Sequence, residues 1–407
     1  MSALLDYLNQ HGPDGITAAL GIKVATHPAF PSLRQFTYDQ INSPKDHPVV
    51  VEARGAICEP VDGRWRYVAR PFSRFFNVGE PGVAIAPHEI ATCSVAEKLD
   101  GSLIIAYAYA DGWHFATRGR PAADGECSSA FGADGRPWVG TFARLADMAS
   151  PGLRTVLMLV PEVDRLTLLF ELTAPENRVV IPYTTRRMTL LAARDTVTGE
   201  YIDRSQLVSL AARLLVPAVA EHPAADFDAL RARVNAARAI DSEGVVLVSP
   251  CGQKRAKLKN DAYVSLHHAV GSGDSTRAIV EMVRNNEGDE VIAHFPHIRE
   301  ARDRVAAEWA RWVSEASGAA RKVARDAGER PPVGGRGDPV FGVWMKGAAA
   351  LVQKRREEWA PSVDSYVFTA LRAAEDASAD AWLRGQTTDA IIRALGLKAS
   401  AEKGDTE

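Results

Sequence analysis

Short apolar runs separated by turn residues occupy the first two thirds of the chain, and this pattern predicts a region rich in β-strands. The runs cover residues 48–59, 103–110, 166–172, 188–193 and 244–248. The Asp-Gly pairs at 62–63 and 111–112 each stand between two apolar runs, as expected for tight hairpin turns. We therefore expect antiparallel sheets, with helices at 141–149, 205–214 and 226–239 and a loop at 122–140.

The pattern changes beyond about residue 266, where Ala, Glu and Arg recur with helical spacing and strand signals are missing. A chain of 407 residues also exceeds the size of a usual single core. We therefore predict an α+β protein of two domains, with a boundary near Gly271. Residues 1–270 form the sheet-rich domain and residues 271–407 an all-helical one.

Composition narrows the classes of protein. A formal net charge of -3 excludes a globally basic nucleic-acid binder, so any phosphate contact needs a local basic surface. The four cysteines lie far apart, which fits neither a zinc site nor a disulfide framework and favours a reducing, cytoplasmic compartment. No apolar run is long enough to span a membrane. We expect the protein to be a monomer.

Seven charged residues lie within or beside the apolar strands. They are Arg54, Lys98, Arg118, Glu171, Glu243, Lys257 and Lys259. Any one alone is more often a solvated residue at a strand edge. Converging on one cleft, the cations would bind a polyphosphate and the carboxylates a divalent metal. Neighbouring cations would also lower the pKa of a lysine such as Lys98 and free its amine for nucleophilic attack.

An ordered set of motifs resembles the covalent nucleotidyltransferases, the ligases and capping enzymes. Residues 98–101 (Lys-Leu-Asp-Gly) resemble the first motif in its K-x-D-G form. Residues 170–180, 243–246 and 257–259 resemble the third, fourth and fifth motifs. Residues 53–55, 70–77 and 263–267 are similar to the ATP-dependent RNA ligases of the T-even bacteriophage type, which repair broken tRNA. The resemblance covers roughly residues 50–270.

The resemblance implies an adenylation domain with the ATP-grasp-like antiparallel sheets of that fold. Lys98 would be the adenylated nucleophile, with Lys257 and Lys259 as further catalytic residues. The implied ATP-binding residues are Arg54, Arg74, Phe76, Glu97, Lys98, Gly101, Arg118, Glu171, Glu243, Lys257 and Lys259. Arg74 and Arg118 stand where the family has lysine, so the charge is kept but the contact geometry is open.

The metal would be Mg²⁺ or Mn²⁺, held by Glu171 and Glu243 directly or through water, with Asp289 as a further candidate ligand. Asp289 and Glu290 can equally be an exposed acidic pair. Gly101, which has no side chain, would let its loop approach the nucleotide.

The implied function is ATP-dependent sealing of RNA 5′-phosphate and 3′-hydroxyl ends through a lysyl-adenylate and an adenylated RNA. The partners would be single-stranded or broken-loop RNA, including tRNA, and a separate end-healing kinase or phosphatase. One alternative is a DNA ligase or capping-type enzyme, but these usually carry a stranded domain after the fifth motif. Another is a nucleotide- or RNA-binding protein without catalysis, which would not need the amine of Lys98.

Overall fold

The computed structural model describes residues 2–39, 42–80, 82–110, 112–129, 136–224, 226–272, 276–284, 298–328, 338–372 and 378–397. These residues form two compact units, one within residues 1–264 and the other within 265–401. The first unit combines antiparallel sheets with helices, and the second is mostly helical. The predicted α+β class is therefore confirmed.

The N-terminal unit contains three four-stranded antiparallel sheets and one two-stranded sheet. The first sheet has the order β1 (Ile22–Thr26), β2 (Arg34–Tyr38), β3 (Arg54–Val61) and β4 (Arg64–Ala69). The second has the order β11 (Arg187–Asp195), β10 (Leu166–Thr173), β6 (Ser102–Tyr109) and β7 (Gly112–Ala116). The third has the order β12 (Glu221–Pro223), β5 (Ser94–Glu97), β13 (Gly244–Val248) and β14 (Arg255–Lys259). β8 (Glu126–Ser129) pairs with β9 (Trp138–Thr141).

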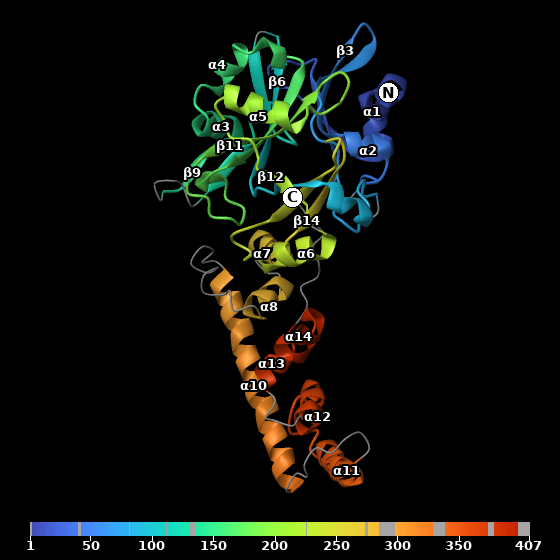
Figure 1. Cartoon of the computed structure of the whole chain (residues 1–407), viewed down its shortest axis with the longest axis vertical. Helices are drawn as coiled ribbons and strands as arrows, with labels where there is room; N and C mark the ends of the chain where they lie inside the picture. Colours follow the sequence, from blue (N-terminus) through green and yellow to red (C-terminus); the bar gives the residue numbers. More distant parts are fainter. Residues whose placement is uncertain are drawn as a thin grey trace. The chain divides into compact units, whose positions relative to one another are not determined.

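Helices cover these sheets from several sides. They are α1 (Ala3–Leu20), α2 (Pro48–Glu52), α3 (Phe142–Ala149), α4 (Leu153–Met158), α5 (Arg204–Arg213) and α6 (Phe227–Ala236), with short 3₁₀ turns at Pro87–Thr92, Pro161–Val163 and Pro175–Asn177. In Figure 1, α1 and α2 lie beside β3, while α3, α4 and α5 lie on the sheet that contains β6 and β11. Helices therefore pack against the sheets of this unit.

Strand β10 is buried on both faces, and this burial determines where Glu171 points. Phe170 and Leu172 pack into the core under α3 and α5. Leu169 packs with Ile105 into the core on the opposite face. Because side chains alternate along a strand, Glu171 lies on the Leu169 face. The carboxylate therefore points toward the space between the sheets and not toward the helices.

Two local predictions were wrong. The strand predicted from residue 48 begins only at Arg54, because Pro48–Glu52 form a helix. Pro48 occupies the first helical turn, where its missing N–H costs nothing, and the His47 ring accepts the free N–H of Val49 at 3.3 Å. The predicted loop at 122–140 contains β8 and β9. Both Asp-Gly hairpins, by contrast, connect the strands that the pattern predicted.

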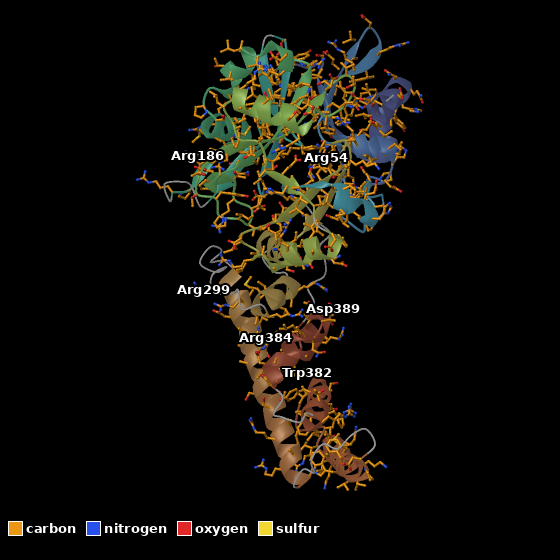
Figure 2. The ribbon with its side chains drawn as sticks, viewed as in Figure 1. Arg54, Arg186, Arg299, Trp382, Arg384 and Asp389 are labelled. Carbon is orange, nitrogen blue, oxygen red and sulfur yellow. The ribbon has the colours of Figure 1, made fainter. Side chains whose placement is uncertain are left out.

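The C-terminal unit is helical throughout its described residues. Its helices are α8 (Thr276–Arg284), α10 (Arg299–Asp326), α11 (Pro339–Lys354), α12 (Asp364–Arg372), α13 (Ala379–Arg384) and α14 (Thr388–Ala394), with a 3₁₀ turn at Pro361–Val363. Figure 1 shows the shorter helices along one side of α10. The ring of Trp382, labelled in Figure 2, stacks on Trp312 with centroids 5.7 Å apart. A further helix, α7 (Asp261–Ser272), contains the division between the units and the predicted boundary at Gly271.

The helices of the described residues include none that is long and apolar enough to cross a membrane. The four cysteines are free thiols, with Cys58, Cys93 and Cys127 buried and Cys251 exposed.

Candidate functional site

Lys98 lies in the short connection between two sheets. β5 ends at Glu97 and β6 begins at Ser102. The backbone N–H of Lys98 donates to the carbonyl oxygen of Gly244 at 3.1 Å, which continues the pairing of β5 with β13. The Lys98 Nζ lies 2.6 Å from Oε1 of Glu243, and the lysine side chain is 22% exposed against 6% for the glutamate. The amine is therefore accessible and is held by a buried carboxylate.

Asp100 fixes the loop that carries Lys98. Its carboxylate accepts the backbone N–H groups of Val180 at 2.8 Å and Ile181 at 2.7 Å, and the hydroxyl of Tyr263 at 2.6 Å. Three donors to one buried carboxylate are a strong constraint, because charge-assisted hydrogen bonds strengthen in a low-dielectric interior. This positioning role of Asp100 and Tyr263 was not predicted from the sequence.

A close contact with another strand explains why residue 101 is a glycine. A Cβ atom at this position would collide with the carbonyl oxygen of Leu172 on β10. The loop therefore passes β10 at a distance that only glycine permits. The expected approach to a nucleotide stays a prediction, whereas the contact with Leu172 accounts for the residue type.

Strand β14 supplies two lysines on one face. Buried Leu258 lies between Lys257 and Lys259 and points to the opposite side. The Lys259 Nζ lies 3.4 Å from Oε1 of Glu243, so one carboxylate serves both Lys98 and Lys259. Gly244, with φ of 134°, pairs with Lys259, and a Cβ there would collide with the Leu258 carbonyl oxygen. Close contact of β13 and β14 thus brings these charges together.

The segment after β4 is tied to β14 by its backbone. The N–H of Lys257 donates to the carbonyl oxygen of Phe76 at 2.9 Å, and the Lys257 carbonyl oxygen accepts from Val78 at 2.8 Å. The Lys257 Nζ lies 5.4 Å from the ring centroid of Phe75, within range of a cation–π contact. Phe76 itself is buried. Residues 70–77, which carry one of the family-like motifs, therefore lie against Lys257.

The cations are close enough to change the protonation of Lys257. Burial, followed by the positive charges of Arg54, Lys259, Lys98 and Arg74, lowers the pKa of Lys257 to about 7. Desolvation and like charge both disfavour an ammonium. The cluster is thus an electropositive site in which an added anion would be favoured.

Arg54, labelled in Figure 2, begins β3 and has an unsatisfied donor. Its Nη1 is buried and has no hydrogen-bond partner among the described residues. Burial lowers the pKa of Arg54, and its guanidinium lies 5.7 Å from the Phe75 ring centroid. A buried charged donor without a partner is costly unless a ligand satisfies it. A phosphate oxygen would fit this position.

Arg74 and Tyr38 form a second part of the cluster. Nη2 of Arg74 lies 3.0 Å from Oε1 of Glu80, and Nη1 donates to the Tyr38 hydroxyl at 3.3 Å. The Arg74 guanidinium also lies 4.6 Å from the Phe76 ring centroid. Burial alone would raise the pKa of Tyr38, but nearby arginines more than reverse this effect and lower it. Tyr38 was missed from the sequence because an aromatic residue at a strand end carries no distinctive signal.

Arg118 lies two residues after the end of β7, and its charge is close to the arginine cluster. Its carbonyl oxygen accepts the Thr37 hydroxyl at 2.6 Å, and its positive charge contributes to the lowered pKa values of Tyr38 and Arg54. Glu97 is exposed at the end of β5, and its N–H donates to Ala220 at 3.4 Å. Arg118 therefore faces the arginine cluster, whereas the exposed Glu97 is separate from the buried carboxylates.

Glu171 is the second carboxylate of the site. Its strand neighbours are Leu103 on β6 and Thr189 on β11. Burial raises the pKa of Glu171 to about 8, although the charge of Lys98 opposes the shift. The negative charge of Glu243 adds to the rise. A carboxyl poised in this way would ionise on the arrival of a cation.

The described side chains offer a metal at most a partial set of ligands. Among the described residues, no group of three or more His, Cys, Asp or Glu side chains is placed to hold an ion. Asp289, the third predicted ligand, lies outside the described residues. Mg²⁺ is commonly held by one or two carboxylates together with water and substrate phosphates. Glu243 and Glu171 beside a phosphate-binding cluster fit such a site.

The chain resembles proteins named as RNA ligases. It is 29% identical over 284 residues to a protein of Autographa californica nuclear polyhedrosis virus named as a bifunctional polynucleotide kinase/RNA ligase, covering 66% of this chain and 38% of that protein. It is 34% identical over 160 residues to RNA ligase 1 of bacteriophage TS2126, covering 37% of this chain and 36% of that protein. The chain thus spans less than two fifths of the length of these curated relatives.

The solved structures to which the chain is similar include an archaeal ATP-dependent RNA ligase, with a TM-score of 0.43 and 14% identity over 74% of this chain and 73% of that one. An RNA ligase of Naegleria gruberi with ATP and Mn has a TM-score of 0.33 and 17% identity over 45% of this chain and 53% of that one. The family model described as RNA ligase matches residues 52–263, which is more than half of the chain and includes the motifs at 98–101, 170–180, 243–246 and 257–259. The chain belongs to this RNA ligase family.

Proposed function

We propose that this chain is an ATP-dependent RNA ligase that joins a 5′-phosphate end to a 3′-hydroxyl end. The observation that carries the proposal is the pairing of the Lys98 amine with Glu243 at 2.6 Å beside a cluster of cations. Family membership supports the same reaction class. A nucleophile, a phosphate-binding cluster and two carboxylates are the groups that covalent nucleotidyl transfer requires.

In the first step, the deprotonated Lys98 amine attacks the α-phosphorus of ATP. A phosphorus–nitrogen bond forms, the bond to the pyrophosphate oxygen breaks, and pyrophosphate leaves. Lys257, Lys259 and Arg54 stabilise the negative charge on the phosphates, since their charges lie close together and the buried Nη1 of Arg54 has no hydrogen-bond partner among the described residues. Glu243 orients Lys98 through its 2.6 Å contact.

In the second step, an oxygen of the RNA 5′-phosphate attacks the same phosphorus and the Lys98 nitrogen leaves, which gives an adenylated RNA end. In the third step, the RNA 3′-hydroxyl attacks the 5′-phosphorus, and AMP leaves as the phosphodiester forms. The protein aligns the two ends and stabilises charge, and it supplies no further covalent group.

We assign Glu243 and Glu171 as the protein carboxylates for Mg²⁺ or Mn²⁺, directly or through water. When bound, the ion neutralises charge on the phosphates. Support comes from the elevated pKa of Glu171, which is about 8 because the carboxyl is buried beside other carboxylates. Asp289 stays a prediction.

The complete set of proposed ATP-binding residues is the one that the family resemblance implies. The proposed set is Arg54, Arg74, Phe76, Glu97, Lys98, Gly101, Arg118, Glu171, Glu243, Lys257 and Lys259. Of these, Glu97 has the weakest support because it is exposed at a strand end. Tyr38 joins the set as the hydrogen-bond partner of Arg74.

We further propose that residues 1–270 form the adenylation domain with the ATP-grasp-like nucleotidyltransferase fold, and that the helical residues 271–407 choose the RNA. The substrate class is single-stranded or broken-loop RNA, including tRNA. The relative named as a kinase/RNA ligase supports cooperation with an end-healing activity. A cytoplasmic monomer stays a prediction.

The test is self-labelling with ATP that carries the label on its α-phosphate. The wild-type chain should retain label with ATP and not with GTP, which separates an RNA ligase from a GTP-using capping enzyme. Lys98→Ala should abolish labelling. Lys254→Ala is the matched control, because Lys254 pairs with Glu89 at 3.5 Å and is half-exposed outside the cluster. Label that persists on Lys98→Ala would remove the lysine from its proposed role.

Sealing is tested separately with RNA that carries a 5′-phosphate and a 3′-hydroxyl. The wild-type chain should join the two ends and release AMP, whereas DNA of the same sequence should be a poorer substrate. Preferential sealing of DNA would instead favour the DNA ligase alternative.

A further inference from the structure

A pocket in the N-terminal unit lies beside the Lys98 loop and is lined by residues to which the proposed adenylation step assigns no role. Its lining residues are Leu99, Thr173, Pro182, Tyr183, Thr184, Thr185, Arg187 and Thr189. Leu99 directly follows the nucleophile in the chain. The other residues come from the end of β10, the start of β11 and the connection between them.

The pocket is continuous with the face of β10 that carries Glu171. Thr189 is the direct cross-strand partner of Glu171, and Arg187 is the partner of Thr173. Directly opposite residues of an antiparallel pair have Cβ atoms about 4.5–5.5 Å apart. Thr173 follows Glu171 by two positions and therefore shares its face. The pocket thus begins one side chain away from a carboxylate of the reaction site.

The Tyr183 hydroxyl also connects the pocket to the Lys98 loop. It accepts the backbone N–H of Asp100 at 3.2 Å. Burial raises the pKa of this hydroxyl to about 12, and the nearby charge of Glu171 adds to the rise. The neutral Tyr183 phenol therefore connects the pocket lining to the Lys98 loop through this hydrogen bond. It also lies near enough to Glu171 for the charge of that carboxylate to affect its pKa.

The chemistry of the lining favours a sugar phosphate. Four threonine hydroxyls and one tyrosine hydroxyl can each donate and accept a hydrogen bond, and Arg187 supplies an exposed guanidinium. The lining contains no carboxylate, so a phosphate would meet no repulsion from it. Hydroxyl groups match the hydroxyls of a ribose, and a guanidinium matches a phosphate oxygen.

The triphosphate of ATP belongs elsewhere in the site. Its phosphates fit the cluster of Arg54, Lys257 and Lys259, and none of these three residues lines the pocket. The pocket therefore offers a place for the other substrate of the reaction, close to the lysine that carries the adenylate.

We propose that this pocket binds the terminal nucleotide of the RNA strand that ends in a 3′-hydroxyl, with the threonines reading its ribose 2′-hydroxyl and Arg187 holding its phosphate. The inference rests on the proposed RNA ligase function and assigns the acceptor to a named part of the site. The 2′-hydroxyl is the group that distinguishes RNA from DNA. The pocket would therefore give the sealing step its preference for RNA acceptors.

The experiment separates the acceptor step from ATP chemistry. The donor is an oligonucleotide that already carries the 5′-adenylate, and the acceptors are two RNAs that differ only in a 2′-hydroxyl or a 2′-deoxy terminal nucleotide. The variants are Thr189→Val, which keeps side-chain volume, and Arg187→Ala. Arg165→Ala is the matched control, because Arg165 is an exposed arginine that pairs with Asp195 at 3.6 Å.

Both variants should label themselves with ATP at the wild-type rate. Thr189→Val should lower kcat/KM for the ribose acceptor about tenfold and bring the ratio of ribose to deoxyribose sealing toward one. Arg187→Ala should raise KM for both acceptors by a similar factor and leave the ratio unchanged.

Three outcomes would overturn the assignment. Unchanged acceptor kinetics in both variants would show that the pocket does not bind the acceptor. Loss of self-labelling with normal sealing of the pre-adenylated donor would place the adenosine of ATP there instead. A variant with a lowered melting temperature and equally reduced rates in every step would indicate a structural role. Failure of the proposed function is distinct, since the wild-type chain would then fail to label itself.

Discussion

The Tyr263 hydroxyl donates a 2.6 Å hydrogen bond to the carboxylate of Asp100, a residue 163 positions earlier in the chain. Asp100 lies two residues after Lys98, and Tyr263 lies four residues after Lys259. The contact therefore joins the loop that carries Lys98 to the segment that follows Lys257 and Lys259. Burial raises the pKa of Tyr263 far above its usual value, so the phenol stays a donor at all working pH values.

Tyr263→Phe removes this donor and keeps the ring. We expect the stability to fall by about 1–3 kcal/mol, because a buried charged acceptor loses one of its partners. The Lys98 loop should also be less well held, so self-labelling should slow more than ATP binding weakens. Thermal unfolding and the single-turnover rate of labelling measure the two effects. Tyr7→Phe in α1, where the ring contacts His11 at 4.4 Å, is the control and should change neither quantity.

Glu243→Gln tests the carboxylate shared by Lys98 and Lys259. The amide keeps the size of the side chain but leaves two ammonium groups without their common counter-ion at 2.6 and 3.4 Å. We expect self-labelling to fall by about a hundredfold or more, as when a group that acts in the transition state is removed. Glu89→Gln is the control, because this half-exposed carboxylate lies outside the cluster, where it pairs with Lys254 at 3.5 Å and accepts the backbone N–H of Ala86 at 2.8 Å.

Folding must be measured beside the rate. The melting temperature of Glu243→Gln should stay near that of the wild-type chain, because the Lys98 and Lys259 side chains that lose their counter-ion are 22% and 35% exposed and can be solvated by water. A variant that labels itself at the wild-type rate would rule out both the positioning role and the metal role of Glu243.

The sequence predicted the strands of the site better than the contacts between them. Glu171 lies on β10, and Lys257 and Lys259 lie on β14, so these three residues are on strands, as their apolar surroundings predicted. The helix at Pro48–Glu52 was missed, since three consecutive valines favour a strand and a capping His47 decided otherwise.

Long-range contacts left no local signal. The bond between Asp100 and Tyr263 and the bond between Arg74 and Tyr38 both depend on how separate sheets pack. The glycine at 101 was noticed, but its reason is the Leu172 carbonyl oxygen on another strand, which the motif does not encode. The motifs therefore selected residues for their resemblance to a family, and only the fold explains what several of these residues contact.

The binding of ATP should depend on pH through Lys257. Its pKa is lowered to about 7 because it is buried among other cations. Bound phosphate favours the protonated form, so raising the pH from 6 to 8 should weaken ATP binding as the free site loses its proton. Lys257→Arg stays charged throughout this range and should flatten the profile. Calorimetric titration with ATP at several pH values measures the trend, and an identical profile in both proteins would contradict it.

The lowered pKa of Lys257 also makes the free energy of unfolding depend on pH. Between about pH 7 and the ordinary lysine value of 10.5, the unfolded chain holds a proton at Lys257 that the folded chain lacks. Stability should therefore rise with pH across this window relative to Lys257→Met, which carries no titrating group. Denaturant unfolding at pH 7 and pH 9 compares the two proteins. A wild-type chain that loses stability relative to the variant over this range would contradict the lowered pKa.

Gly101→Ala tests whether the passage of the Lys98 loop beside β10 is required. The added methyl group would meet the backbone carbonyl oxygen of Leu172, and neither partner is the flexible end of a side chain. The loop must then move away from β10, which would displace Lys98 from Glu243. We expect self-labelling to fall by about a hundredfold, because misplacement of a nucleophile by about 1 Å has this effect.

Gly112→Ala is the matched control, since a Cβ at that position has nothing within 4 Å. It should label itself normally and unfold near the wild-type temperature. The pre-adenylated donor adds a second measurement, because sealing from that donor does not need the Lys98 amine to attack ATP. Gly101→Ala should therefore lose more activity in self-labelling than in sealing. Equal losses in the two steps would mean that the glycine holds the whole sheet and not the position of Lys98.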